Sequence, residues 1–280
     1  MLQWTEHLFS FQEGEICGKS CGNGRRLLLC MHGYMQDRHL FDQVFDEVPS
    51  DWQILSLDLP LFGKSCWDNL EQAIDVHFLQ KLLEAIRQCF QPEAIHLLGF
   101  SMGGEVAMRM LMHDMVCAPW HILIAPVGIR PNRWHAFIRR NPIGKALLQF
   151  LFHNPSLVIG LSRMSEKLGF IDRGTARFVR ANFSSEKNRQ LLYGQLNIYQ
   201  LIQVRFSEFI RLVKQKPIQW IVIWGKEDEV MPSHLVYRMG KYLDHVDTHL
   251  VNGPHRITDV APQAVGEIVK RYMQDMVSEQ

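Results

Sequence analysis

The sequence lacks several features that would place it in a specialised class of proteins. Its formal net charge is only +1 over 280 residues, so the chain as a whole has no bias toward nucleic acid. It contains no internal repeat and no low-complexity tract. Its longest apolar stretch, 146–161, is interrupted by His153-Asn154-Pro155 and is too short to span a bilayer. These absences favour an ordinary globular protein. The length of 280 residues suits one large domain, or one domain with an insertion.

The sequence also lacks the signals of secretion and of metal binding. Residues 1–7 have neither the basic segment nor the apolar segment of a signal peptide, so we expect a cytoplasmic protein whose six cysteines are reduced. Cys17 and Cys21 are spaced closely enough for a metal pair, but no second Cys or His pair at zinc-finger spacing accompanies them. We therefore expect plain thiols here rather than a metal pair.

The most informative segment is Gly99-Phe100-Ser101-Met102-Gly103-Gly104. An apolar run at 94–98 precedes it and predicts a buried strand, and the segment 105–112 that follows has helical spacing. A serine flanked by glycines on a strand-to-helix turn is the pattern of a nucleophile elbow. The alternative is a bystander serine in a glycine-rich turn. The elbow predicts Ser101 as nucleophile, with the backbone N–H of Met102 facing the developing oxyanion.

The pattern along the chain predicts an α/β fold with a mostly parallel sheet flanked by helices. After an opening hairpin at 4–20, strand and helix patterns alternate, which is typical of parallel strands joined by crossover helices. The apolar runs that predict these strands lie at 26–31, 52–57, 94–98 and 121–126, and a long helix is predicted at 69–90.

The alternation stops at residue 128 and resumes with a strand at 218–224. Only helical patterns lie between them, for example at 196–213. We therefore predict a core domain of residues 1–127 and 217–280, with an inserted helical cap, or lid, of residues 128–216 over the carboxyl ends of the strands.

Two later loops carry the partners that a serine nucleophile needs. Asp228 follows the strand at 218–224, and His255 lies on a Gly253-Pro254 loop before the last helix. The order serine, acid, histidine is the order expected of the elbow fold. His255 would take the proton of Ser101, and Asp228 would hold the other ring N–H and fix the tautomer.

Other acids remain candidates for the third position. Glu227 and Glu229 flank Asp228, and the sequence alone does not exclude either of them. Asp247, at the start of the last strand, and Asp259, beyond the histidine, fit this role less well.

The strand predicted at 26–31 leads into His32-Gly33-Tyr34, at the strand end where open sheets bind ligands. The backbone N–H of Tyr34 is the second predicted oxyanion donor, paired with that of Met102. We interpret His32 as a structural residue that holds this loop. Asp58, after the next strand, is interpreted as capping the loop that follows it rather than as the catalytic acid.

Together these motifs resemble the α/β-hydrolase superfamily, in particular its serine esterase and C–C hydrolase group with a helical cap. The motifs are His32-Gly33-Tyr34, Asp58-Leu59-Pro60, Phe62-Gly63-Lys64-Ser65, the elbow, Trp224-Gly225 with Asp228 and Pro232, and Gly253-Pro254-His255. The loop after Pro60 departs from the family, because Leu61 and Phe62 stand where a glycine and often a histidine are usual. The serine nucleophile argues against the epoxide-hydrolase and haloalkane-dehalogenase branches, which use aspartate.

The resemblance implies a serine hydrolase that forms an acyl-enzyme on Ser101 and needs no metal and no organic cofactor. The predicted cap is rich in Leu, Phe, Ile and Met, which favours an ester or thioester substrate with an apolar acyl part. Hydrolysis of a carbon–carbon bond in a diketone and acyl transfer to another acceptor remain alternatives within the fold. A non-catalytic ligand-binding protein on the same fold is the alternative from another class.

Charge divides unevenly between the predicted domains. Residues 128–216 hold sixteen basic and four acidic residues, a formal charge of +12, against −11 in the rest. One interpretation is solvated helix faces and attraction between cap and core. The other is recruitment of an anionic partner, such as an acyl carrier protein, coenzyme A, a carboxylated substrate or an anionic membrane surface.

Overall fold

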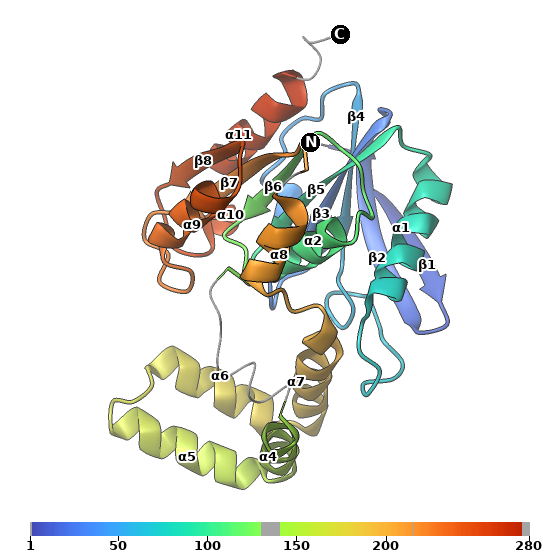
Figure 1. Cartoon of the computed structure of the whole chain (residues 1–280). Coiled ribbons are helices and arrows are strands. Elements are labelled where there is room, and N and C mark those ends of the chain that lie inside the picture. Colours follow the sequence, from blue (N-terminus) through green and yellow to red (C-terminus); the bar gives the residue numbers. More distant parts are fainter. Residues whose placement is uncertain (1, 130–140, 215, 276–280) are drawn as a thin grey trace. The chain divides into compact units, whose positions relative to one another are not determined.

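The computed structural model describes residues 2–129, 141–214 and 216–275, and its described part is built on one eight-stranded sheet (Figure 1). The strand order is β1-β2-β4-β3-β5-β6-β7-β8. The β1–β2 and β2–β4 pairs are antiparallel, and all the pairs from β4 to β8 are parallel. The strands are β1 (Thr5–Phe11), β2 (Gly14–Gly22), β3 (Arg26–Met31), β4 (Trp52–Leu57), β5 (Ala94–Phe100), β6 (Trp120–Ile124), β7 (Gln219–Gly225) and β8 (Val246–Val251).

Burial explains why the sequence shows continuous apolar runs at the central strands. Every residue of β6 is buried, and β3, β5 and β7 are buried from their second residue to their last. Crossover helices cover both faces of a parallel sheet, so these strands need apolar side chains on both sides. The predicted α/β class with a mostly parallel sheet is confirmed.

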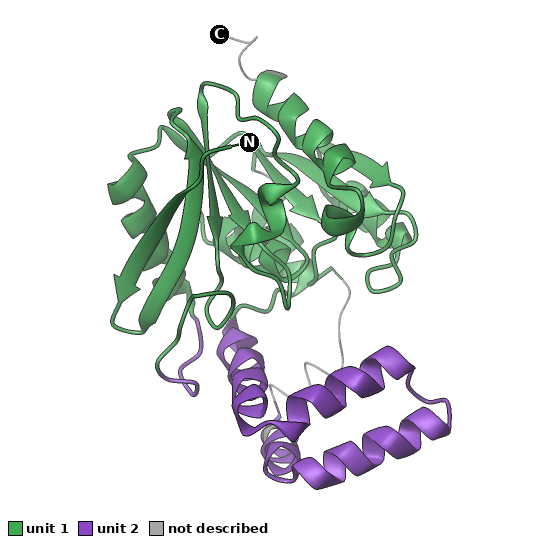
Figure 2. Ribbon diagram, turned by 180° about the vertical axis from the view of Figure 1, so that it is seen from behind, with its two compact units in different colours: residues 1–68, 75–131, 202–280 green, residues 69–74, 132–201 purple. Residues whose placement is uncertain are grey.

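The chain divides into two compact units (Figure 2). Unit 1 comprises Met1–Asp68, Asp75–Pro131 and Ile202–Gln280 and contains the sheet. Its described helices are η1 (Arg38–Asp42), α1 (Val76–Phe90), α2 (Met102–Met112), α8 (Phe206–Val213), η3 (Ser233–Leu235), α9 (Val236–Tyr242), α10 (Ile257–Val260) and α11 (Pro262–Asp275).

Unit 2 comprises Asn69–Ile74, which forms turns, and Asn132–Leu201, whose described elements are helices. It has a small core of its own, built on Phe152, Phe183 and Leu192. Its helices are α4 (Pro142–His153), α5 (Pro155–Lys167), α6 (Arg173–Ser184), α7 (Glu186–Ile198) and η2 (Tyr199–Leu201). The segment 130–140, which belongs to the predicted cap, lies outside the described residues.

The main segment of unit 2, Asn132–Leu201, contains fewer residues than the cap of residues 128–216 predicted from the sequence. Helix α8 belongs to unit 1, and Phe209 on it packs edge-to-face against Trp220 of β7. The preceding segment is held on α2, because the side chain of Glu105 accepts a hydrogen bond from the N–H of Val204 at 2.8 Å. These contacts attach residues 202–213 to the sheet-bearing unit.

Two helices begin or end elsewhere than the periodicity predicts. Helix α1 starts at Val76, because Asp75 caps it by accepting a hydrogen bond from the N–H of Phe78 at 2.9 Å. The predicted helix over 69–90 is therefore wrong for its first part. The predicted helix over 196–213 is interrupted, since α7 ends at Ile198 and α8 begins only at Phe206.

Candidate active site

Ser101 lies at the junction of β5 and α2 with a backbone conformation that L-residues rarely adopt. Its φ is +51° and its ψ is −108°. Such backbone persists only when the surroundings determine it. Here the N–H of Ser101 donates to the carbonyl of Ile124 on β6 at 2.9 Å, and its own carbonyl accepts from the N–H of Val127 at 3.1 Å. The neighbouring strand thus holds the sharp turn that the glycine-flanked serine predicts.

Gly103 shows why the second residue after the serine has no side chain. A Cβ atom on Gly103 would lie 2.1 Å from the carbonyl oxygen of Met31, at the end of β3. The first turn of α2 therefore rests directly on the segment that leads into His32 and Gly33. The two predicted oxyanion donors, the N–H groups of Tyr34 and Met102, belong to these neighbouring segments. Their action on an oxyanion stays a prediction.

Asp228 is buried between exposed neighbours in the loop after β7. Its Oδ1 accepts a hydrogen bond from the N–H of Met231 at 2.7 Å, and its Oδ2 lies 2.7 Å from Nδ1 of His255. Glu227 and Glu229 on either side are exposed. The carboxylate that reaches the histidine is therefore that of Asp228.

The two other acids considered from the sequence have different partners. The carboxylate of Asp247 accepts a hydrogen bond from the hydroxyl of Tyr272. Asp259 forms an ion pair with Arg256 and accepts from the side-chain amide of Gln36.

His255 connects the acid to the serine. Its Nε2 lies 2.9 Å from Oγ of Ser101. Because a carboxylate only accepts hydrogen bonds, Nδ1 carries the proton toward Asp228 and Nε2 is left to accept from the serine hydroxyl. Gly225 permits this approach, since a Cβ there would lie 2.5 Å from the carbonyl oxygens of Gly253 and Pro254. The loop that carries the histidine thus passes directly over the end of β7.

Ser101, His255 and Asp228 form a continuous series of hydrogen bonds on loops at the carboxyl ends of parallel strands. This arrangement is typical of α/β-hydrolase folds. A model described as the alpha/beta hydrolase family matches residues 27–268 of the chain. The chain belongs to this family.

Several distant relatives of this alpha/beta hydrolase span most of its length. An uncharacterized hydrolase, YugF, from Bacillus subtilis is 22% identical over 261 residues, covering 89% of this chain and 90% of that protein. The human monoacylglycerol lipase ABHD6 is 21% identical, covering 86% of this chain and 73% of the lipase. A thermophilic esterase from Thermogutta terrifontis shares the fold with a TM-score of 0.66 at 16% identity, covering 98% of both chains.

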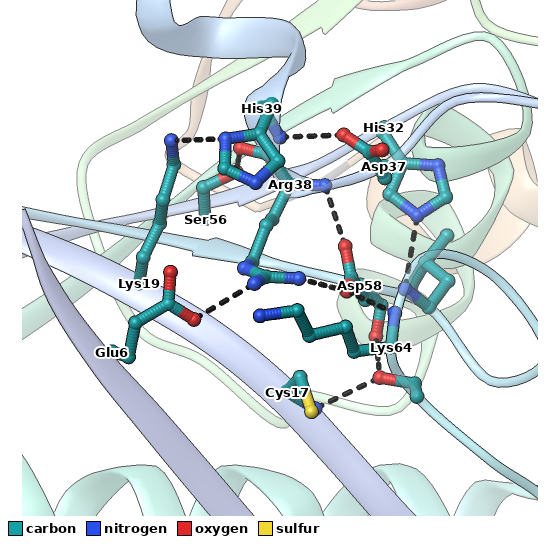
Figure 3. A network of polar contacts seen from close by, with 12 residues as sticks. Glu6, Cys17, Lys19, His32, Asp37, Arg38, His39, Ser56, Asp58 and Lys64 are labelled. Carbon is teal, nitrogen blue, oxygen red and sulfur yellow. Dashed lines mark hydrogen bonds and ion pairs between the residues drawn. The ribbon is translucent and has the colours of Figure 1, made fainter.

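His32 and Asp58 of this alpha/beta hydrolase are buried and hold loops together (Figure 3). Nε2 of His32 accepts from the N–H of Leu59 at 3.0 Å, so Nδ1 carries the proton and donates to the carbonyl of Gly33 at 2.7 Å. Burial lowers the pKa of His32, which favours this neutral form. Asp58 accepts from the N–H of Lys64 at 2.7 Å. These contacts agree with the structural roles expected of both residues.

Arg38, which is not predicted from the sequence, is buried beside Asp58 (Figure 3). Its N–H donates to Oδ1 of Asp58 at 2.6 Å and its guanidinium to Oδ2 at 2.5 Å, while Glu6 of β1 accepts a further guanidinium N–H at 2.8 Å. This ion pair secures the end of the loop that contains Tyr34. A single arginine carries no periodic signal, so nothing in the sequence pattern marks it.

The described residues hold no group of three or more His, Cys, Asp or Glu side chains that could bind a metal ion. All six cysteines are free thiols. Within the same ranges, no helix has the length and apolar character needed to cross a membrane.

Proposed function

We propose that this alpha/beta hydrolase is a serine hydrolase that cleaves a carboxylic ester or thioester with an apolar acyl part. The observation that carries the proposal is the pair of contacts at His255, 2.9 Å to Oγ of Ser101 and 2.7 Å to the carboxylate of Asp228.

In the first half of the reaction, Nε2 of His255 takes the proton of Ser101 while Oγ attacks the acyl carbon. The resulting oxyanion accepts hydrogen bonds from the N–H groups of Met102 and Tyr34. Asp228 stabilises the imidazolium without taking its proton. The imidazolium then protonates the leaving group, and the acyl group remains on Ser101 as an ester.

In the second half, His255 takes a proton from water, which attacks the acyl-enzyme, and then returns a proton to Oγ of Ser101. The carboxylic acid leaves and the enzyme is restored. The side chains of this chain supply the nucleophile, the base and the donors that these steps require.

The side chains of unit 2 favour an apolar acyl part. It leaves large apolar residues exposed, among them Phe150, Leu161 and Met164 on its helices and Phe170 in the turn after α5. Apolar side chains of this kind line most small-molecule sites. The exposed cations Arg163, Lys167, Arg173, Arg177 and Lys187 on the same unit favour an anionic carrier, acyl carrier protein or coenzyme A, as the group attached to the acyl chain.

The test combines a fluorophosphonate label with a panel of p-nitrophenyl esters and acyl thioesters of increasing chain length. We expect the label on Ser101 and none on Ser101→Ala, with turnover that rises with acyl length. Labelling without ester or thioester turnover would favour carbon–carbon bond hydrolysis or acyl transfer. A folded protein whose Ser101 stays unlabelled would contradict the proposal and favour a binding protein.

A further inference from the structure

Trp224 makes an unexpected contact beneath the loop that carries Asp228. It is the penultimate residue of β7 and its side chain is fully buried. Its indole Nε1–H donates a hydrogen bond to the carbonyl oxygen of Met231 at 2.5 Å. The N–H of the same Met231 donates to Oδ1 of Asp228 at 2.7 Å. Both backbone groups of Met231 are thus engaged, one by the indole and one by the carboxylate.

Among the described residues, few other hydrogen bonds hold the second half of the loop between β7 and Pro232. Backbone hydrogen bonds hold its first half, from the N–H of Lys226 to Val251 and from the N–H of Glu227 to Gly253. Residues 226, 227, 229 and 230 are exposed, so they contribute little packing. Met231 is 5% exposed and Asp228 is 4% exposed. The hydrogen bond from the indole therefore fixes the position of Met231, and the N–H of Met231 in turn holds the carboxylate of Asp228.

We propose, on the basis of the function proposed above, that Trp224 is a positioning residue for the reaction. Through the backbone of Met231 it sets the orientation of the Asp228 carboxylate toward Nδ1 of His255. It touches neither the substrate nor the reacting atoms, so it is not a catalytic residue.

The chemistry of the indole suits this role. It combines a large apolar body, which the sheet buries, with one hydrogen-bond donor at a fixed place on the ring. A phenylalanine at 224 would fill most of the same space but would leave the Met231 carbonyl without its donor. Met231 could then shift, and its N–H would no longer hold Oδ1 of Asp228 in line with the histidine.

The chain provides a matched control in Trp120 on β6. Its side chain is 2% exposed, and its indole N–H has no hydrogen-bond partner among the described residues. Trp120→Phe therefore removes the same volume as Trp224→Phe without removing a hydrogen bond. A difference between the two variants measures what the Trp224 hydrogen bond does.

Steady-state hydrolysis of p-nitrophenyl butyrate gives the first measurement. We expect Trp224→Phe to lower kcat about 3- to 10-fold, the range of one net hydrogen bond, with KM within about 2-fold of the wild type. Trp120→Phe should leave both constants within about 2-fold. Equal losses of kcat in the two variants would overturn the proposal, because they would indicate general loosening of the core.

A double-mutant cycle with Asp228→Asn gives the second measurement. If Trp224 acts through Asp228, adding Trp224→Phe to Asp228→Asn causes no further loss of kcat. The same fold loss in both backgrounds would contradict the proposal. Should Trp224→Phe fail to fold, 3-benzothienylalanine at position 224 keeps the ring shape, removes the N–H and tests the same prediction.

The proton between Nδ1 of His255 and Asp228 provides a readout that needs no substrate. We expect its far-downfield NMR resonance to shift or disappear in Trp224→Phe and to stay unchanged in Trp120→Phe. An unchanged resonance in both would overturn the positioning role. A wild type that keeps this resonance but leaves Ser101 unlabelled by fluorophosphonate would instead count against the proposed function.

Discussion

Replacing Asp228 by asparagine tests the central assignment most directly. Both oxygens of the carboxylate accept a hydrogen bond, Oδ1 from the N–H of Met231 and Oδ2 from Nδ1 of His255, each at 2.7 Å. An amide has only one acceptor oxygen. Whichever way the amide is turned, its NH₂ group faces one of these two partners.

The cost of each orientation follows from the geometry. With the amide oxygen toward Met231, the NH₂ group faces Nδ1 of His255, which must then give up its proton and accept. The ring proton moves to Nε2, which donates to Oγ of Ser101 instead of accepting from it. With the opposite orientation, the buried N–H of Met231 meets an NH₂ group and loses its acceptor, which costs about 1–3 kcal/mol.

We expect Asp228→Asn to lower kcat by about 10³- to 10⁴-fold, because the histidine is held in the wrong tautomer. The corresponding rise in the activation free energy is about 4–5.5 kcal/mol. The assay is p-nitrophenyl ester hydrolysis, together with the rate of fluorophosphonate labelling of Ser101. The far-ultraviolet circular dichroism spectrum should match that of the wild type.

Glu227→Gln is the matched control, since it changes the adjacent, exposed carboxylate in the same way. Its kcat should stay within about 2-fold of the wild type, because changes at exposed side chains away from a site have small effects. A deep loss in Glu227→Gln with near-normal turnover in Asp228→Asn would refute the reasoning.

Three further predictions concern the elbow, the sheet and the charge of unit 2. Gly103→Ala should lower kcat about 100-fold or more, because the new Cβ would meet the Met31 carbonyl and separate the two proposed oxyanion donors; activity close to that of the wild type would contradict this. Burial lowers the pKa of His96 to about 4 and of His121 to about 3. The unfolded chain, with histidine pKa values near ~6.5, binds more protons below that pH. The free energy of unfolding should therefore fall as the pH drops from about 6.5 toward 4, by about 3 kcal/mol for His96 alone. Denaturant titrations across this range should show a shallower fall for His121→Asn, and an identical pH dependence would count against the assignment. Turnover of a carrier-bound acyl ester should decrease as salt is added while that of the free ester stays constant; equal rates at all salt concentrations would remove the anionic carrier from the proposal.

The sequence by itself determined the strands of the core and the chemistry of their loops. Apolar runs such as 26–31 and 94–98 predict buried parallel strands, because a strand covered on both faces must be apolar throughout. The glycines around Ser101 predict a tight turn, because they stand where a Cβ would collide. Local motifs and their order along the chain predict Ser101, Asp228 and His255 as the residues of the site. Their hydrogen bonds to one another depend on the fold, because it brings the three loops together.

Only the tertiary structure decided which neighbouring residues face the site and which helices join which unit. The sequence favours Asp228 without excluding Glu227 or Glu229. In the structure Asp228 is buried, and its carboxylate accepts a hydrogen bond from the N–H of Met231. The periodicity of 196–213 does not reveal that α8 packs against β7, and no pattern links Trp224 to Met231 or Arg38 to Asp58. The physical reason is that periodicity and turn residues act over a few neighbours. Contacts between distant segments depend on the register of the sheet and the course of its loops.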